Sequence, residues 1–186
     1  MKISSVILAF LAGSSLLAGS SALAPAQSGV PSARDVVAPS AFVSLEPVPR
    51  GSSFQIAVVM KIRPGFHVNA REVSEDYLIP TDLQLELPSG LRASAPLYPK
   101  GTLKKFLFSP EKPLNVYAGS AVIRVLLSVL PAAALGGAHI PLKLRYQACS
   151  DDVCLPPVTV KLQADFSIAA AGASARRPHP ELFRGK

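Results

Sequence analysis

The chain has only two cysteines, Cys149 and Cys154, and both lie in the stretch YQACSDDVCLPP (146–157). Two thiols at this spacing can form a cystine that stabilises the fold. They can also form a redox couple that exchanges electrons with the sulfur atoms of another protein, or bind a soft metal ion such as Cu(I). The residues themselves leave these three alternatives open.

The two cysteines lie between the last two predicted strands, in the connection of a hairpin. There they can close on each other across a short loop. A ring of this size stabilises a fold by roughly 2 kcal/mol, less than a bridge between distant strands would. A pair at a loop tip is also open to a partner thiolate. Asp151 and Asp152 complicate this, because carboxylates near a thiol raise its pKa and slow its attack.

Period-two alternation of apolar and polar residues predicts strands in FQIAVVMKI (54–62), TDLQLELPSG (81–90), SAVIRVLLSVLP (120–131), AHIPLKLRYQA (138–148) and PVTVKLQADF (157–166). In the second segment Leu83, Leu85 and Leu87 are expected on one buried face. Pro and Gly punctuate the segments, and no sustained helical stripe is present. The sequence therefore predicts an all-β fold, an immunoglobulin-like antiparallel β-sandwich, with a small barrel as the competitor.

The ends of the chain differ in composition from this central part. Residues 1–26 combine a basic start, an apolar run and small residues before Ala24 and Ala26, and we interpret them as a signal peptide, with a permanent membrane anchor as the alternative. We expect a flexible linker over 27–39, the folded domain over 40–168 and a disordered tail over 169–186. The product is then periplasmic or otherwise exported and soluble after cleavage, where a disulfide persists.

The formal net charge of +7 is dispersed, and the basic residues are not interleaved with aromatic ones, so we predict no nucleic-acid partner. His67, His139 and His179 are scattered, and none has a cysteine or carboxylate at ligand spacing, so we predict no metal site and no cofactor. The stretch RPGFHVNA (63–70) is interpreted as a turn and an edge strand. Copper binding by the cysteine pair stays open as an alternative.

The cysteine stretch, preceded by PLKLRY, resembles the active-site hairpin of the N-terminal periplasmic domain of the thiol:disulfide interchange protein DsbD family. The similarity extends over FHVNAREVSEDYLIPTDLQLELPSG (66–90) and YPKGTLKKFLFSPEKPLNVYAG (98–119), and so covers most of 54–166. The resemblance implies an immunoglobulin-like exchange domain. Here it would be a stand-alone exported protein, without the membrane helices and thioredoxin-like domain of the full-length family protein.

The resemblance also implies a relay through transient protein contacts. Electrons would come from a membrane thiol transporter and pass to exported thioredoxin-like proteins through a mixed disulfide. Cys154 resembles the cysteine that bonds to the partner, and Cys149 the one that resolves the bond. The only alternative function beside copper handling is a non-catalytic protein-binding module with a structural disulfide.

In the family an aromatic side chain on a loop covers the couple. The matching position here makes Phe106 the first candidate for this cap and Phe108 the second, although both could equally be core residues on one strand face. Tyr146, Asp151 and Asp152 complete the expected environment of the couple. Where the family has acidic residues before the cap, this chain has Lys104-Lys105, which would favour a thiolate and oppose the two aspartates.

Overall fold

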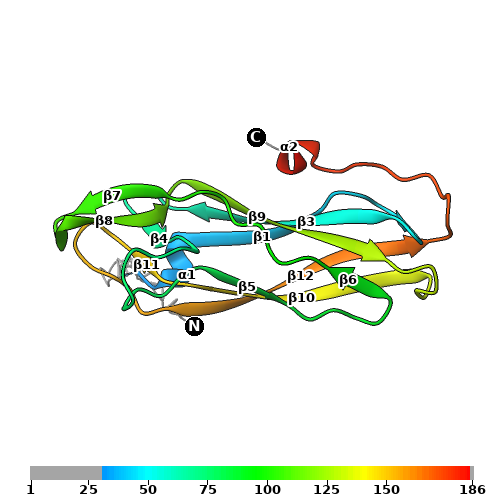
Figure 1. Ribbon diagram of the computed structural model, residues 1–186, viewed down its shortest axis with the longest axis horizontal. Helices are drawn as coiled ribbons and strands as arrows, with labels where there is room; N and C mark the ends of the chain where they lie inside the picture. The colour runs from blue at the N-terminus through cyan, green and yellow to red at the C-terminus, as the bar shows by residue number, and fades with distance from the viewer. Residues whose placement is uncertain (1–30, 185–186) are drawn as a thin grey trace, which may run out of the picture. The chain divides into compact units, whose positions relative to one another are not determined.

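The structure is a computed structural model that describes residues 31–184 (Figure 1). The predicted signal peptide, 1–26, and the first part of the predicted linker, 27–30, lie outside the described residues. No helix in the described part is long and apolar enough to cross a bilayer.

One layer of the fold is a four-stranded antiparallel sheet in which β3 and β9 are central. The strand order is β1 (Val37–Val43), β3 (Ser53–Ile62), β9 (Ser120–Val129) and β6 (Leu91–Ala93). The long β3–β9 pair runs from Ser53 opposite Ser128 to Lys61 opposite Ser120. These are the segments in which alternating β-branched residues predicted strands.

The facing layer is a second four-stranded sheet built on the β10–β12 hairpin. Its order is β2 (Val48–Pro49), β12 (Val158–Ala169), β10 (Gly136–Tyr146) and β5 (Asp82–Leu85). β2 pairs parallel to β12, and the other neighbours are antiparallel. β10 and β12 remain paired up to Tyr146 opposite Val158, so the segment between them, which holds both cysteines, emerges from the end of this sheet.

A third, smaller sheet lies at one end of these two layers (Figure 1). Its order is β11 (Ala148–Cys149), β4 (His67–Asn69), β8 (Ser109–Tyr117) and β7 (Thr102–Phe106). β11 belongs to the β10–β12 connection, so this sheet joins the cysteine segment to the β7–β8 hairpin through the three residues of β4. We call residues 102–117 the cover hairpin.

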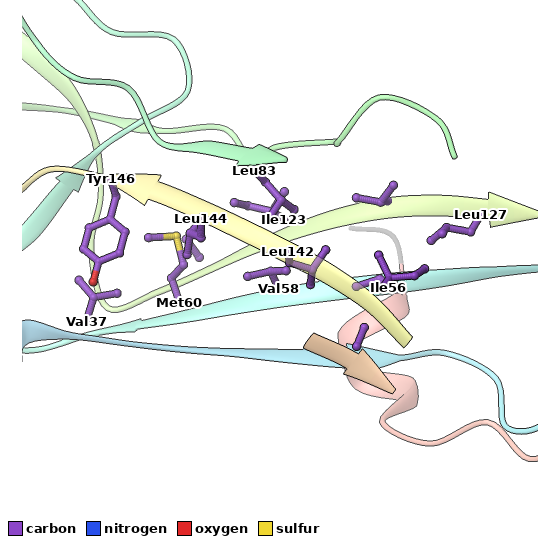
Figure 2. Packing of buried hydrophobic residues seen from close by; sticks show 14 of the residues in the cluster. Val37, Ile56, Val58, Met60, Leu83, Ile123, Leu127, Leu142, Leu144 and Tyr146 are labelled. Atoms are coloured by element: carbon purple, nitrogen blue, oxygen red, sulfur yellow. The ribbon is translucent and has the colours of Figure 1, made fainter. Parts of the chain in front are cut away.

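The main core fills the space between the two long sheets (Figure 2). On β3, β9 and β10 every second residue is buried, which confirms the alternation predicted for these segments: Phe54, Ile56, Val58, Met60, Ile62, Ile123, Val125, Leu127, Val129, Ile140, Leu142, Leu144 and Tyr146. Leu87 is a wrong prediction, because β5 ends at Leu85 and the Leu87 side chain is exposed. The fold is an immunoglobulin-like β-sandwich, as the sequence predicts.

A second, small cluster of buried residues is separate from the main core. It consists of Leu78, Phe106, Leu114 and Val116, with Val73 packed against it. Three of its members belong to the cover hairpin. The hairpin therefore has apolar packing of its own, and it joins the main core through Tyr117 at the end of β8.

The predicted linker boundary is wrong for residues 33–39. Residues Ala33–Val36 form a short helix, α1, and β1 begins at Val37 and pairs with β3. Ala33, Val36 and Val37 are buried in the main core. The stretch lacks a clear period because it is a helical turn followed directly by a strand, so the domain begins before residue 40.

The prediction of a disordered tail over 169–186 is also wrong for the described residues 169–184. Glu46 and Arg176 exchange two backbone hydrogen bonds of 3.0 and 2.9 Å. A second short helix, α2 (Pro180–Phe183), contacts β3, and Arg124 Nε donates to the Leu182 carbonyl at 2.6 Å. Backbone pairing holds this segment, although it has few large apolar residues.

Candidate functional site

The cysteine hairpin is a tight turn whose two flanking residues are Cys149 and Cys154. The Ser150 amide donates to the Val153 carbonyl at 2.9 Å, and the Leu155 amide donates to the Ala148 carbonyl at 2.8 Å. Between these two hydrogen-bonded steps the cysteines face each other with their Cα atoms 4.0 Å apart, and their sulfurs form a disulfide. This is the cross-strand pairing that the hairpin position predicts.

The two sulfur-bearing residues differ in exposure. Cys149 belongs to β11 and is 1% exposed, whereas Cys154 is only partly buried. A nucleophile that arrives from solvent therefore meets Cys154 first. Disulfide exchange depends on which sulfur can be approached.

A polar network at the base of the hairpin fixes its orientation. The Asn69 side-chain amide donates to the Ile79 carbonyl at 3.1 Å and to Gln147 Oε1 at 3.2 Å. Gln147 Nε2 in turn donates to the Leu155 carbonyl at 3.4 Å. Gln147 thus links β4 to both sides of the cysteine turn. The position of Gln147, two residues before Cys149, could have indicated this role. Nothing in the sequence indicated its hydrogen bond with Asn69.

The cover hairpin reaches the cystine region through Phe106. Phe106 is 4% exposed and stacks on the His67 ring, with centroids 4.0 Å apart. Phe108 lies in the turn between β7 and β8, stacks on Phe106 at 5.3 Å and is partly exposed. The two phenylalanines are therefore not on one strand face. Phe106 packs inward, and Phe108 extends the stack toward the surface.

His67 is the residue of this site that the sequence reasoning missed. It lies directly opposite Cys149 in the β4–β11 pair, and it is 2% exposed. Burial, with a smaller contribution from the nearby Lys104 ammonium, lowers the pKa of His67 to about 4, against an opposing effect of Asp151. Because β4 is buried on both faces, its sequence has no alternation that marks His67.

Two charged side chains beside the couple, Lys104 and Asp151, form an ion pair. Lys104 Nζ of the cover hairpin lies 3.0 Å from Asp151 Oδ1 of the cysteine turn, and both side chains are largely exposed. Lys104 Nζ also lies 4.9 Å from the centre of the Phe106 ring. Asp152 is exposed beside Asp151. The lysine and the aspartate that the sequence placed in opposition thus offset each other at ion-pair distance.

A shallow pocket of about 300 Å3 lies between the cover hairpin and the cysteine turn. Its lining residues are Lys105, Phe106, Leu107, Pro110 and Asp151. Over residues 31–184, no group of three or more His, Cys, Asp or Glu side chains is arranged to hold a metal ion.

Tyr146, which the sequence analysis expected in the environment of the couple, belongs to the main core. Its ring is fully buried and points toward Val37 (Figure 2), and its hydroxyl donates to the Ala33 carbonyl at 3.1 Å. Burial raises the pKa of Tyr146 above its ordinary value. Tyr146 therefore joins α1 to the end of β10, from which the cysteine segment emerges.

The solved structures similar to this chain include N-terminal domains of DsbD and ScsB. The N-terminal domain of DsbD from Neisseria meningitidis in the reduced form is 22% identical, with 74% of this chain and 90% of that chain covered and a TM-score of 0.38. The same domain in complex with the PilB N-terminal domain is 19% identical, with coverage of 75% and 88% and a TM-score of 0.38. The N-terminal periplasmic domain of ScsB from Proteus mirabilis is 13% identical, with coverage of 65% and 43% and a TM-score of 0.46.

No curated protein sequence matches the chain significantly. The family assignment rests instead on a sequence profile, described as "Thiol:disulfide interchange protein DsbD, N-terminal", which matches residues 33–165. The match spans α1, the sandwich strands, the cover hairpin and the cysteine turn. The chain therefore belongs to the family of DsbD N-terminal domains, which are thiol:disulfide exchange modules, and Cys149 and Cys154 form its disulfide.

Proposed function

We propose that this protein carries reducing equivalents in the periplasm and passes them to partner proteins through a mixed disulfide. The observation that carries the proposal is the cystine at a hairpin tip with one sulfur-bearing residue buried and the other accessible. A purely structural bridge gains little at this position, because β10 and β12 are already paired up to the turn.

In the proposed transfer, the reduced chain meets an oxidised partner. The Cys154 thiolate attacks one sulfur of the partner disulfide, forms the mixed disulfide and releases the second partner sulfur as a thiolate. Cys149 then loses its proton and attacks Cys154 Sγ. This closes the Cys149–Cys154 bond and releases the first partner sulfur. Two electrons pass to the partner, which leaves as a dithiol.

The surface around the couple suits short-lived protein contacts. Leu107 and Val153 are at least half exposed, at 81% and 50%. Leu107 lines the pocket and Val153 lies in the cysteine turn, so a partner with an apolar rim could dock there without a large permanent interface. By family membership, the proposed recipients are exported thioredoxin-like proteins, and the proposed donor is a membrane thiol transporter.

The proposed roles of the cysteines are tested by trapping. With Cys149→Ser, the mixed disulfide formed by Cys154 cannot be resolved, so a covalent complex with an exported thioredoxin-like protein should accumulate on non-reducing gels. The matched variant Cys154→Ser should trap nothing, because Cys149 is buried. Trapping by Cys154→Ser alone would reverse the roles.

A redox titration separates this function from its alternatives. Equilibration with glutathione or dithiothreitol should give a reduction potential above about −300 mV, the range of exchange proteins. A bridge that resists both reductants until the domain unfolds would indicate a structural disulfide in a binding module. Stoichiometric Cu(I) uptake that Cys149→Ser abolishes would indicate metal handling.

A further inference from the structure

His67 has the properties of an unused base beside the buried cysteine. It is 2% exposed, and its Nε2 is buried without a hydrogen-bond partner. An unpartnered polar atom in the interior costs roughly 1–3 kcal/mol. An apolar residue would satisfy the packing of β4 against Phe106 without this cost, so packing alone does not account for a histidine here.

The proposed exchange needs a base at this place. Cys149 must lose its proton before it can attack Cys154, because the thiolate and not the thiol is the nucleophile. Cys149 is 1% exposed, and a partner bound to Cys154 covers the turn further. The proton therefore needs an acceptor within the protein.

The strand pairing puts His67 within reach of that proton. Cys149 and His67 are directly opposite in the β4–β11 pair, so their side chains project from the same face with Cβ atoms about 5 Å apart. An imidazole and a thiol can span this separation. Stacking on Phe106 holds the ring in place from the side of β7.

The charged groups that act on His67 are Lys104 from β7 and Asp151 from the cysteine turn. They pair with each other at 3.0 Å, and neither bonds to the ring. In the disulfide form, burial keeps the pKa of His67 at about 4, so the imidazole is neutral and Nε2 or Nδ1 offers a lone pair at neutral pH.

We propose that His67 is the proton acceptor for Cys149 in the resolving step. The Cys149 Sγ–H bond breaks as the proton moves to the imidazole, and the sulfur electron pair attacks Cys154 Sγ. The Cys149–Cys154 bond forms, and the bond between Cys154 and the partner breaks. The partner sulfur leaves with the electron pair and takes up the proton from the imidazolium. This inference rests on the proposed exchange function.

The test follows the two sulfur attacks separately. Reduced protein is mixed with dithiobis(nitrobenzoate), a chromogenic disulfide, in a stopped-flow spectrometer. Attack by Cys154 releases the first thionitrobenzoate, and resolution by Cys149 releases the second. His67→Gln removes the titratable base, His67→Phe also retains a ring to stack on Phe106, and His139→Gln, at an exposed position on β10, is the matched control.

Both His67 variants should slow the second release at least about tenfold at neutral pH, while the first release stays within about twofold of wild type. The difference in the rate of the second release between wild type and the His67 variants should become smaller as the pH approaches the pKa of the Cys149 thiol, since hydroxide then removes the proton. His139→Gln should follow wild type in both phases. An unchanged second release in both His67 variants would overturn the proposal.

A measurement on the wild-type protein does not depend on how the variants fold. The NMR shifts of the His67 ring nitrogens at neutral pH should differ between the reduced and the oxidised protein, because only reduced Cys149 has an S–H group that can donate a hydrogen bond to the imidazole. Identical ring-nitrogen shifts in both redox states would overturn the role of His67. If wild type shows no first release and no transfer to partners, the exchange function itself fails, which is a distinct outcome.

Discussion

At the scale of single residues, the environment of His67 couples the stability of the protein to pH. The folded, disulfide-bonded state holds the pKa of His67 at about 4, from an ordinary value of 6.5. Between these two values the unfolded chain binds more protons at this site than the folded chain does. The free energy of unfolding therefore falls as the pH falls through this window.

We expect His67 to account for a loss of about 3 kcal/mol between pH 6.5 and pH 4, with no further loss below that. Urea unfolding of the oxidised protein across this range measures it. His67→Phe should lack this part of the acid destabilisation, while His139→Gln should keep it. Parallel pH profiles for His67→Phe and wild type would contradict the expected shift.

The sequence could identify the cysteine couple but not its neighbour. Cys149 and Cys154 stand in one hairpin, so their pairing follows from local spacing. His67 reaches Cys149 only because β4 pairs with β11, which is about eighty residues further along the chain. β4 is three residues long and buried on both faces, so no alternation marked His67 or Asn69 as part of a site.

At the scale of elements, we expect the cover hairpin to control how a thiol reaches the couple. Phe106 is buried between the hairpin and His67, whereas Phe108 extends the stack outward and is partly exposed. Lys104 of the hairpin adds an ion pair with Asp151 of the cysteine turn. An exposed pair of this kind contributes at most about 1 kcal/mol. We therefore expect the apolar packing of Phe106 to hold the hairpin in place more strongly than this ion pair does.

Replacement of Phe106 by alanine should speed reduction of the disulfide by dithiothreitol about tenfold. The substitution removes the ring that stacks on His67, the residue opposite Cys149, and the rate of exchange depends on access to the sulfurs. Quenched time points with thiol labelling would measure the rate. Phe108→Ala is the matched control and should change the rate by no more than about twofold. A wild-type rate in Phe106→Ala would show that the hairpin does not limit access.

Alternation predicted the long strands well because β3, β9 and β10 each bury one face against the other layer. It was less reliable where tertiary contacts end a strand. Leu87 continues the pattern of Leu83 and Leu85, but pairing with β10 stops at Leu85. The cover hairpin was found through its family resemblance, since the exposed face of β7 has little periodicity of its own.

At the scale of the whole domain, the described C-terminal segment is part of the fold. It is held by the backbone pair of Glu46 with Arg176, by the contact of Phe42 with His179 and by the bond from Arg124 to Leu182. Composition could not predict this, because the bonds are made mostly by backbone atoms, which every residue type supplies.

Deletion of residues 170–186 should lower the free energy of unfolding by about 2–3 kcal/mol, roughly one for each lost hydrogen bond. The fold and the dithiothreitol reduction rate should remain, since the segment packs on β1, β3 and β9. Chemical denaturation and the rate assay measure the two quantities. Deletion of 185–186 alone serves as the control. Unchanged stability in the longer deletion would show that the segment contributes nothing.

Three of the four buried apolar side chains of the cover hairpin, Phe106, Leu114 and Val116, pack with Leu78 in the small cluster, and Tyr117 at the end of β8 belongs to the main core. The contacts that hold the hairpin in place therefore differ largely from those that hold the sandwich together. We expect substitutions in the small cluster to change the mobility of the hairpin more than the thermal stability of the sandwich. Under the proposed exchange function, the reactivity of the couple and the heat resistance of the domain can then be adjusted by different substitutions.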